Sequence, residues 1–171
     1  RYYSRALAIG RSIAPDGDIV MEVMRRQGQC LQLLGRNSEA LSVLGTARTM
    51  ARRQGDRFEE GVALRAIAET LLEMGDLDSA ARHAEASVEA LGRLDARYET
   101  AKARVVAARI RMAQIESGLQ RDTAPLLESA WQEAMSALHA FLESDVDDWI
   151  RLARRLAGRL STLRAQGETG T

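Results

Sequence analysis

The apolar positions of this chain follow a helical period. The clearest example is the stretch 62–74, where apolar residues fall at Val62, Leu64, Ile67, Ala68, Leu71, Leu72 and Met74. Most of these positions are three, four or seven residues apart, a spacing that places side chains on one face of an α-helix. No stretch alternates apolar and polar residues over the length of a strand, and no Asn-Gly pair indicates a β-hairpin. The pattern therefore predicts an all-α protein.

The same pattern divides the chain into eight expected helices. The first seven are expected at residues 1–14, 18–34, 38–53, 57–74, 78–93, 97–116 and 123–143, and the last over 144–166. Gly75 supplies a turn, and Asp78 stands where a capping side chain is expected. Ser144, with Asp147 three residues later, resembles a capping box for the last helix. Residues 167–171 are expected to form a disordered tail.

Turn and small residues recur at an interval of forty residues. The segments LQLLGRNSEALSVLGTARTMA, from Leu31, and LLEMGDLDSAARHAEASVEAL, from Leu71, both break at a Gly and resume five residues later on an Ala. A helix, a turn and a second helix together occupy about 34–40 residues, so the interval predicts a repeated helical hairpin. Small residues at fixed places let two helices approach closely. Those in register are Gly28, Ala68 and Ala108, and also Ala47 and Ser87.

This arrangement resembles the tetratricopeptide repeat family, whose repeats place small residues and a Gly-polar turn at set positions. The first full repeat supplies Gly28, Gly35, Ala40, Leu44 and Ala47, and the second supplies Ala68, Gly75, Asp76, Ala80, Ala84 and Ser87. In the third repeat, Ala130, Ala134 and Ala137 keep their mutual spacing but come about ten residues late. The resemblance covers most of residues 1–143. It implies a right-handed superhelical solenoid, with a half repeat at 1–14 and repeats at about 18–53, 57–93 and 97–143.

An apolar stripe marks the helix expected at 144–166. It consists of Val146, Trp149, Ile150, Ala153, Leu156, Ala157, Leu160 and Leu163. We expect this helix to cap the last hairpin by covering its apolar face. Two alternatives are open: a homodimer formed through Trp149 and Leu156, or the first helix of a further repeat.

Composition narrows the classes of partner. Twenty-four basic residues balance twenty-four acidic ones, which argues against a broad electrostatic affinity for nucleic acid or for an anionic membrane. No apolar run approaches the roughly 18 residues of a membrane span. The single cysteine, Cys30, cannot form an internal disulfide, which suits a reducing compartment. We therefore expect a cytoplasmic protein that binds neither nucleic acid nor membrane directly.

Groups that could support catalysis are sparse. His83 and His139 lie on different expected helices, without cysteine or carboxylate partners at the spacing of metal ligands. No Gly-rich loop joins a strand to a helix, so a phosphate-binding loop is not expected. The sequence therefore predicts no metal site, no cofactor and no enzymatic activity.

The resemblance implies a concave groove lined by the first helix of each repeat. The side chains that it places there are Glu22, Arg25, Gln29, Arg65, Glu69, Lys102 and Arg109. The basic members favour an acidic protein or peptide, although Glu22 and Glu69 are also placed to neutralise the arginines within the protein. We expect a protein- or peptide-binding scaffold module within a larger protein. The alternative is a sensory or autoinhibitory region of a multidomain signal-responsive transcription regulator.

Overall fold

The computed structural model describes residues 2–118, 122–144 and 146–169, with side chains up to Ala165. In this described part of the chain all regular structure is helical, and the all-α prediction is confirmed. Each of the first seven helices begins and ends within one residue of its predicted bounds. The helices are α1 (Tyr2–Ile13), α2 (Asp18–Leu33), α3 (Asn37–Gln54), α4 (Arg57–Met74), α5 (Leu77–Gly92), α6 (Arg97–Glu116), α7 (Ala124–Ser144) and α8 (Asp147–Thr169).

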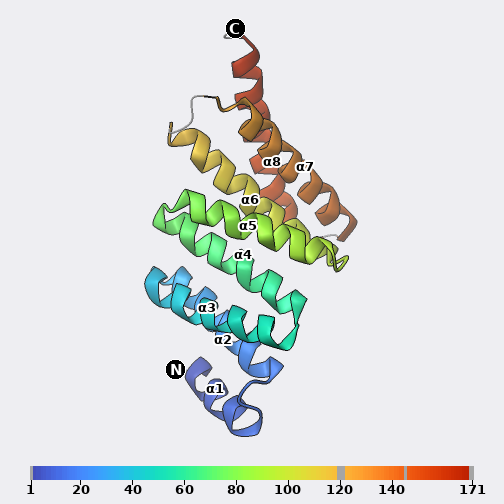
Figure 1. Ribbon diagram of the computed structural model, residues 1–171. Coiled ribbons are helices and arrows are strands. Elements are labelled where there is room, and N and C mark those ends of the chain that lie inside the picture. The colour runs from blue at the N-terminus through green and yellow to red at the C-terminus, as the bar shows by residue number, and fades with distance from the viewer. Residues whose placement is uncertain (1, 119–121, 145, 170–171) are drawn as a thin grey trace. The chain divides into compact units, whose positions relative to one another are not determined.

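The helices divide between two compact units. Unit 1 comprises residues 1–94 and contains α1 to α5, whereas unit 2 comprises residues 95–171 and contains α6 to α8. Within each unit, consecutive helices run antiparallel and pack side by side (Figure 1). Unit 1 therefore contains two complete hairpins, α2–α3 and α4–α5. Unit 2 contains one hairpin, α6–α7, followed by α8.

The turns of unit 1 are built alike and recur every twenty residues. Gly35, Gly55 and Gly75 have φ angles of 71°, 73° and 79°, in the left-handed region that glycine adopts without steric cost. In each case the N–H of the next residue donates to the carbonyl five positions before it, which closes the preceding helix. These bonds are Arg36 to Leu31 at 2.9 Å, Asp56 to Ala51 at 2.9 Å, and Asp76 to Leu71 at 3.0 Å. The forty-residue interval is thus two twenty-residue halves with the same turn.

The cap of α5 lies two residues earlier in the chain than the sequence predicts. The side chain of Asp76, not that of Asp78, accepts a hydrogen bond from the Ser79 N–H at 3.1 Å. The left-handed turn at Gly75 leaves Asp76 as the last non-helical residue, so Asp76 can reach the third residue of the helix. Asp56 caps α4 in the same way by accepting from the Glu59 N–H at 2.9 Å.

The start of α8 also differs from the prediction. Ser144 is the last residue of α7, and its hydroxyl donates to the Ala140 carbonyl at 3.0 Å, so it does not cap α8. The first backbone bond of α8 runs from the Ile150 N–H to the Val146 carbonyl at 3.0 Å. At its other end α8 continues to Thr169, since no proline follows Pro125 to stop it. The helix includes residues 167–169 of the expected tail, and residues 170–171 lie outside the described residues.

Each hairpin of unit 1 has a point where a glycine lies under a leucine. In α2–α3, a Cβ on Gly28 would lie 2.5 Å from Cγ of Leu44, which is fully buried. In α4–α5, a Cβ on Gly61 would lie 2.7 Å from Cγ of Leu91, also fully buried. The glycines therefore allow the closest approach between the two helices of each pair.

The core of unit 2 is completed by α8. Phe141 of α7 is fully buried and stacks on Trp149 of α8, with ring centroids 5.4 Å apart. The Tyr98 ring of α6 meets Phe141 edge to face at 5.8 Å. Leu156, offered above as a dimerisation residue, lies in the same cluster with 6% of its surface exposed. The apolar stripe of α8 thus packs on the α6–α7 hairpin, which is the capping arrangement.

Candidate protein-interaction surface

A row of charged residues lies on the first helices of the two hairpins in unit 1. This first-helix face consists of Glu22, Arg25 and Gln29 on α2 and of Glu59, Arg65 and Glu69 on α4. The guanidinium of Arg25 grips the Glu59 carboxylate with two hydrogen bonds, Nε to Oε2 at 2.7 Å and Nη2 to Oε1 at 3.3 Å. A third donor of Arg25 reaches Oε1 of Gln29 at 3.3 Å.

The Arg25–Glu59 pair is partly shielded from water. The Arg25 side chain is 11% exposed to solvent, and the Glu59 side chain is 15% exposed. Bidentate guanidinium–carboxylate pairs have a fixed planar geometry. Salt screens the attraction within a partly buried pair less than within a pair at an open surface. This pair therefore links the two hairpins of unit 1 and holds Arg25 in one orientation.

The other predicted groove residues of unit 1 also have internal partners. Arg65 is almost fully buried and lies 3.4 Å from the Glu69 carboxylate. Glu22 turns toward Arg26, whose Nε donates to it at 2.9 Å, and this contact raises the pKa of the Arg26 guanidinium. The expectation that glutamates neutralise the arginines applies to Arg65 through Glu69, whereas for Arg25 the neutralising residue is Glu59 instead of Glu22.

The two remaining groove candidates lie on α6, in unit 2. The Lys102 ammonium is 2.8 Å from the Glu99 carboxylate and lies 5.0 Å above the centre of the Tyr98 ring. The Trp149 ring is 5.5 Å away on another side. Lys102 is thus held by an ion pair and by two cation–π contacts. Arg109 lies about two helical turns after Lys102 on α6 and is half-buried.

Sequence reasoning did not assign Glu59 to the site, although one signal pointed to it. Glu59 and Glu99 are forty residues apart and fall in register between the repeats. Each of them forms an ion pair with a basic residue of a first helix. Glu59 pairs with Arg25, and Glu99 pairs with Lys102. An acid that recurs in register near basic positions was therefore a marker of pairing that the sequence already contained.

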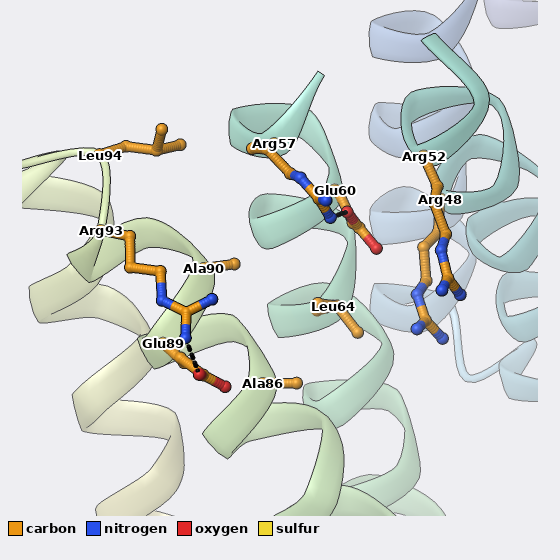
Figure 2. Close-up of a pocket in the computed structure, with 10 residues that line it drawn as sticks. All are labelled: Arg48, Arg52, Arg57, Glu60, Leu64, Ala86, Glu89, Ala90, Arg93 and Leu94. Atoms are coloured by element: carbon orange, nitrogen blue, oxygen red, sulfur yellow. Dashed lines mark hydrogen bonds and ion pairs between the residues drawn. The ribbon is translucent and has the colours of Figure 1, made fainter. Parts of the chain in front are cut away.

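A separate pocket opens on the other side of unit 1, on the second-helix face formed by α3 and α5. Its volume is about 310 Å³. Figure 2 shows the residues that line it. Arg48 and Arg52 project into it from α3, and Glu89 and Arg93 form its opposite wall on α5. Between them, α4 contributes the remaining charged groups and part of the apolar floor. Its full lining is Arg48, Arg52, Arg57, Glu60, Leu64, Ala86, Glu89, Ala90, Arg93 and Leu94.

The sequence of unit 1 matches a known family. Residues 21–93 fit the family model of the tetratricopeptide repeat. Over residues 21–93 the chain is therefore similar to the tetratricopeptide repeat family. The match spans α4 and α5 fully and most of the α2–α3 hairpin, in agreement with the resemblance drawn from the sequence. No curated protein matches the chain at a significant level.

Tetratricopeptide repeats are generally protein-interaction modules and are generally non-catalytic. The two histidines of the chain make contacts within their own helices. Nδ1 of His83 lies 2.8 Å from the Ser79 carbonyl oxygen, and Nε2 of His139 lies 3.4 Å from the Glu143 carboxylate. Over the described residues, no three His, Cys, Asp or Glu side chains gather as metal ligands would. Nor is any of the described helices long and apolar enough to cross a membrane.

Proposed function

We propose that unit 1 binds a segment of a partner protein across its first-helix face. The observation that supports this proposal is the Arg25–Glu59–Gln29 contact on the tetratricopeptide repeats. It fixes a guanidinium between two successive first helices. A group held in one orientation loses little conformational entropy when it binds, so it can contribute to affinity and to selection of the partner.

Arg25 retains the capacity to bind a partner. An arginine side chain has five N–H donors, and the contacts with Glu59 and Gln29 use three of them. The remaining donors suit a carbonyl or carboxylate of a peptide that lies along α2 and α4. Because Glu59 already balances the charge, this face supports recognition by directed hydrogen bonds more than by net attraction.

An exchange of the two charges tests this proposal. Arg25→Glu alone would leave two half-buried carboxylates together and would lower the free energy of unfolding by about 2–4 kcal/mol. The double variant Arg25→Glu with Glu59→Arg restores an ion pair but reverses its direction. We expect it to regain most of the thermal stability and to lose capture of partner proteins, measured by affinity purification from cell extract with quantitative mass spectrometry.

The matched control exchanges an exposed pair on a second helix. Such a pair forms at the start of α3, where Nη2 of Arg36 lies 2.6 Å from Oε2 of Glu39. More than half of each side chain is exposed. Arg36→Glu with Glu39→Arg should leave partner capture unchanged. If the Arg25/Glu59 exchange is stable and still captures the same proteins as the wild type, the first-helix face is not the binding surface.

A further inference from the structure

The pocket between α3 and α5 contains cations that the protein itself does not neutralise. We propose that this pocket is a second docking site, for an acidic peptide segment in which an aspartate or glutamate stands next to an aliphatic residue. The inference rests on the proposed function only in that unit 1 is taken to be a protein-interaction module. It places binding on the second-helix face, whereas the proposal above uses the first-helix face.

Arg48 and Arg52 carry the argument. They stand one helical turn apart on α3 and both project into the pocket (Figure 2). Among the described residues, neither has a hydrogen-bond or ion-pair partner. Like charges four residues apart destabilise a helix, and only Arg52 lies in the last turn, where the helix dipole favours a cation. Helix stability therefore does not account for this arrangement.

The other arginines of the pocket are already paired. Arg57 donates to Glu60 at 2.9 Å, and Arg93 lies 2.6 Å from Glu89. Four arginines against two glutamates leave the pocket with a positive charge, and that charge is concentrated on α3 at Arg48 and Arg52. Two neighbouring guanidinium groups match the oxygens of a carboxylate, to which arginine donates in a bidentate manner.

The floor of the pocket selects a peptide over a simple anion. Leu64 of α4 is buried and lies between the α3 arginines and α5 (Figure 2), where Ala86 and Ala90 are half-buried. Leu94 is 45% exposed at one end. A carboxylate side chain bound to Arg48 and Arg52 would place an adjacent aliphatic side chain over this surface and remove it from water. A volume of about 310 Å³ accommodates a few side chains rather than a folded domain.

Binding of a defined peptide tests the site. The probe is an acetylated, fluorescein-labelled peptide of sequence Glu-Leu-Asp-Asp-Leu-Glu, and fluorescence anisotropy measures its Kd for the full chain at low salt. We expect Arg48→Glu with Arg52→Glu to weaken binding about tenfold or more. Raising the salt concentration should weaken the wild type in the same direction, because exposed charges are screened.

Two controls make the result specific. Arg5→Glu with Arg11→Glu changes the net charge equally, on exposed positions of α1, and should alter the Kd less than about twofold. A peptide with Asn and Gln in place of its acids should not bind measurably. The Arg48/Arg52 variant should keep the wild-type melting temperature within about 2 °C, since both positions are on the surface.

Three outcomes would overturn the inference. The first is equal binding of the acidic peptide to the wild type and to the Arg48/Arg52 variant. The second is no binding of the peptide to the wild type, and the third is Arg48-dependent binding of inorganic phosphate in place of the peptide. None of these touches the first-helix proposal, because the Arg25/Glu59 exchange tests that proposal separately.

Discussion

The two hairpins of unit 1 fill the same helix crossings with different pairs of residues. Near the middle of the first helix, α2–α3 has Gly28 facing Leu44, whereas the equivalent positions of α4–α5 hold Ala68 and Ala84. One hairpin combines the smallest side chain with a large one, and the other combines two small ones. All four residues are buried.

The pairing is inverted at a second crossing. There α2–α3 has Met21 and Ala51, and α4–α5 has Gly61 facing Leu91. In α2–α3 the large residue is on the first helix, whereas in α4–α5 it is on the second helix and the first helix has the glycine. What the repeats share at these places is a filled space between helices, since interiors are close-packed and a void or an overlap is costly. The identity of either residue alone matters less.

The largest predicted effect tests this exchange of volume. Leu44→Ala alone should lower the free energy of unfolding by about 2–5 kcal/mol, because it leaves a cavity above Gly28. Gly28→Ala alone places a methyl group 2.5 Å from Leu44 Cγ and should also destabilise. The double variant reproduces the Ala–Ala pair of α4–α5. It should therefore cost less than the sum of the two changes, as measured by urea denaturation.

The reciprocal exchange in α4–α5 is the matched control. Ala84→Leu should be better tolerated together with Ala68→Gly than by itself, because the glycine gives the leucine its space. A double-mutant cycle measures the coupling in each hairpin. Strict additivity in both hairpins would show that the crossings are not filled in this complementary way.

A smaller effect is expected where the hairpins are the same. Ala40 and Ala80 are both fully buried, at equivalent positions early in α3 and α5. Ala80→Leu should cost about 1–3 kcal/mol through overpacking. The control Glu85→Leu, at an exposed position of α5, should stay within about 0.5 kcal/mol. Equal melting temperatures of the two variants would contradict the equivalence of the crossings.

The fold was predictable because its main signals are local. The glycines at the turns and the alanines early in each second helix fix where helices end and begin, and the helix bounds followed from them. The choice between Asp76 and Asp78 as cap did not follow, since both carboxylates stand near the helix start. Only the left-handed turn at Gly75 decides between them.

The site was predictable only as far as the helices that carry it. Repeat register placed Arg25 on a first helix, but Arg25 and Glu59 are 34 residues apart and on different helices. Their pairing depends on how two hairpins pack, and several other acids were equally available in the sequence. Arg48 and Arg52 gave no signal at all, because an arginine with no partner cannot be distinguished by sequence from one that is paired.

The turns that follow the two hairpins of unit 1 differ in the residue that adopts a positive φ angle. Gly55 follows the first hairpin, whereas the equivalent residue after the second is Asp95, with a φ angle of 51°. An aspartate tolerates this conformation at a cost that glycine does not have. Asp95→Gly should therefore raise the free energy of unfolding by about 0.5–1 kcal/mol, and Gly55→Asp should lower it, in urea denaturation. A loss of stability in Asp95→Gly would show that its side chain has a role beyond the turn.

The smallest predicted effect on stability concerns the side-chain cap at the start of each second helix, α3 and α5. Arg36, before α3, makes no side-chain cap, whereas Asp76 caps α5. The N–H of Ser79 donates to the Asp76 carboxylate and holds its pKa below the ordinary value of 3.8. A carboxyl with a lowered folded pKa stabilises the protein fully above its unfolded pKa, and that contribution is lost as the pH falls through the folded one.

Asp76→Asn keeps a capping oxygen but removes the titration. The melting temperature of the wild type should therefore exceed that of the variant at neutral pH by a small margin, and the margin should shrink as the pH is lowered past 3.8. Arg36→Asn at the equivalent place before α3 adds a capping oxygen without a carboxyl, so it should raise the melting temperature by an amount that is independent of the Asp76 titration. A margin between wild type and Asp76→Asn that stays constant down to acid pH would show that the carboxylate charge contributes nothing to the cap. The two hairpins would then differ at this position only in the presence of a hydrogen-bond acceptor.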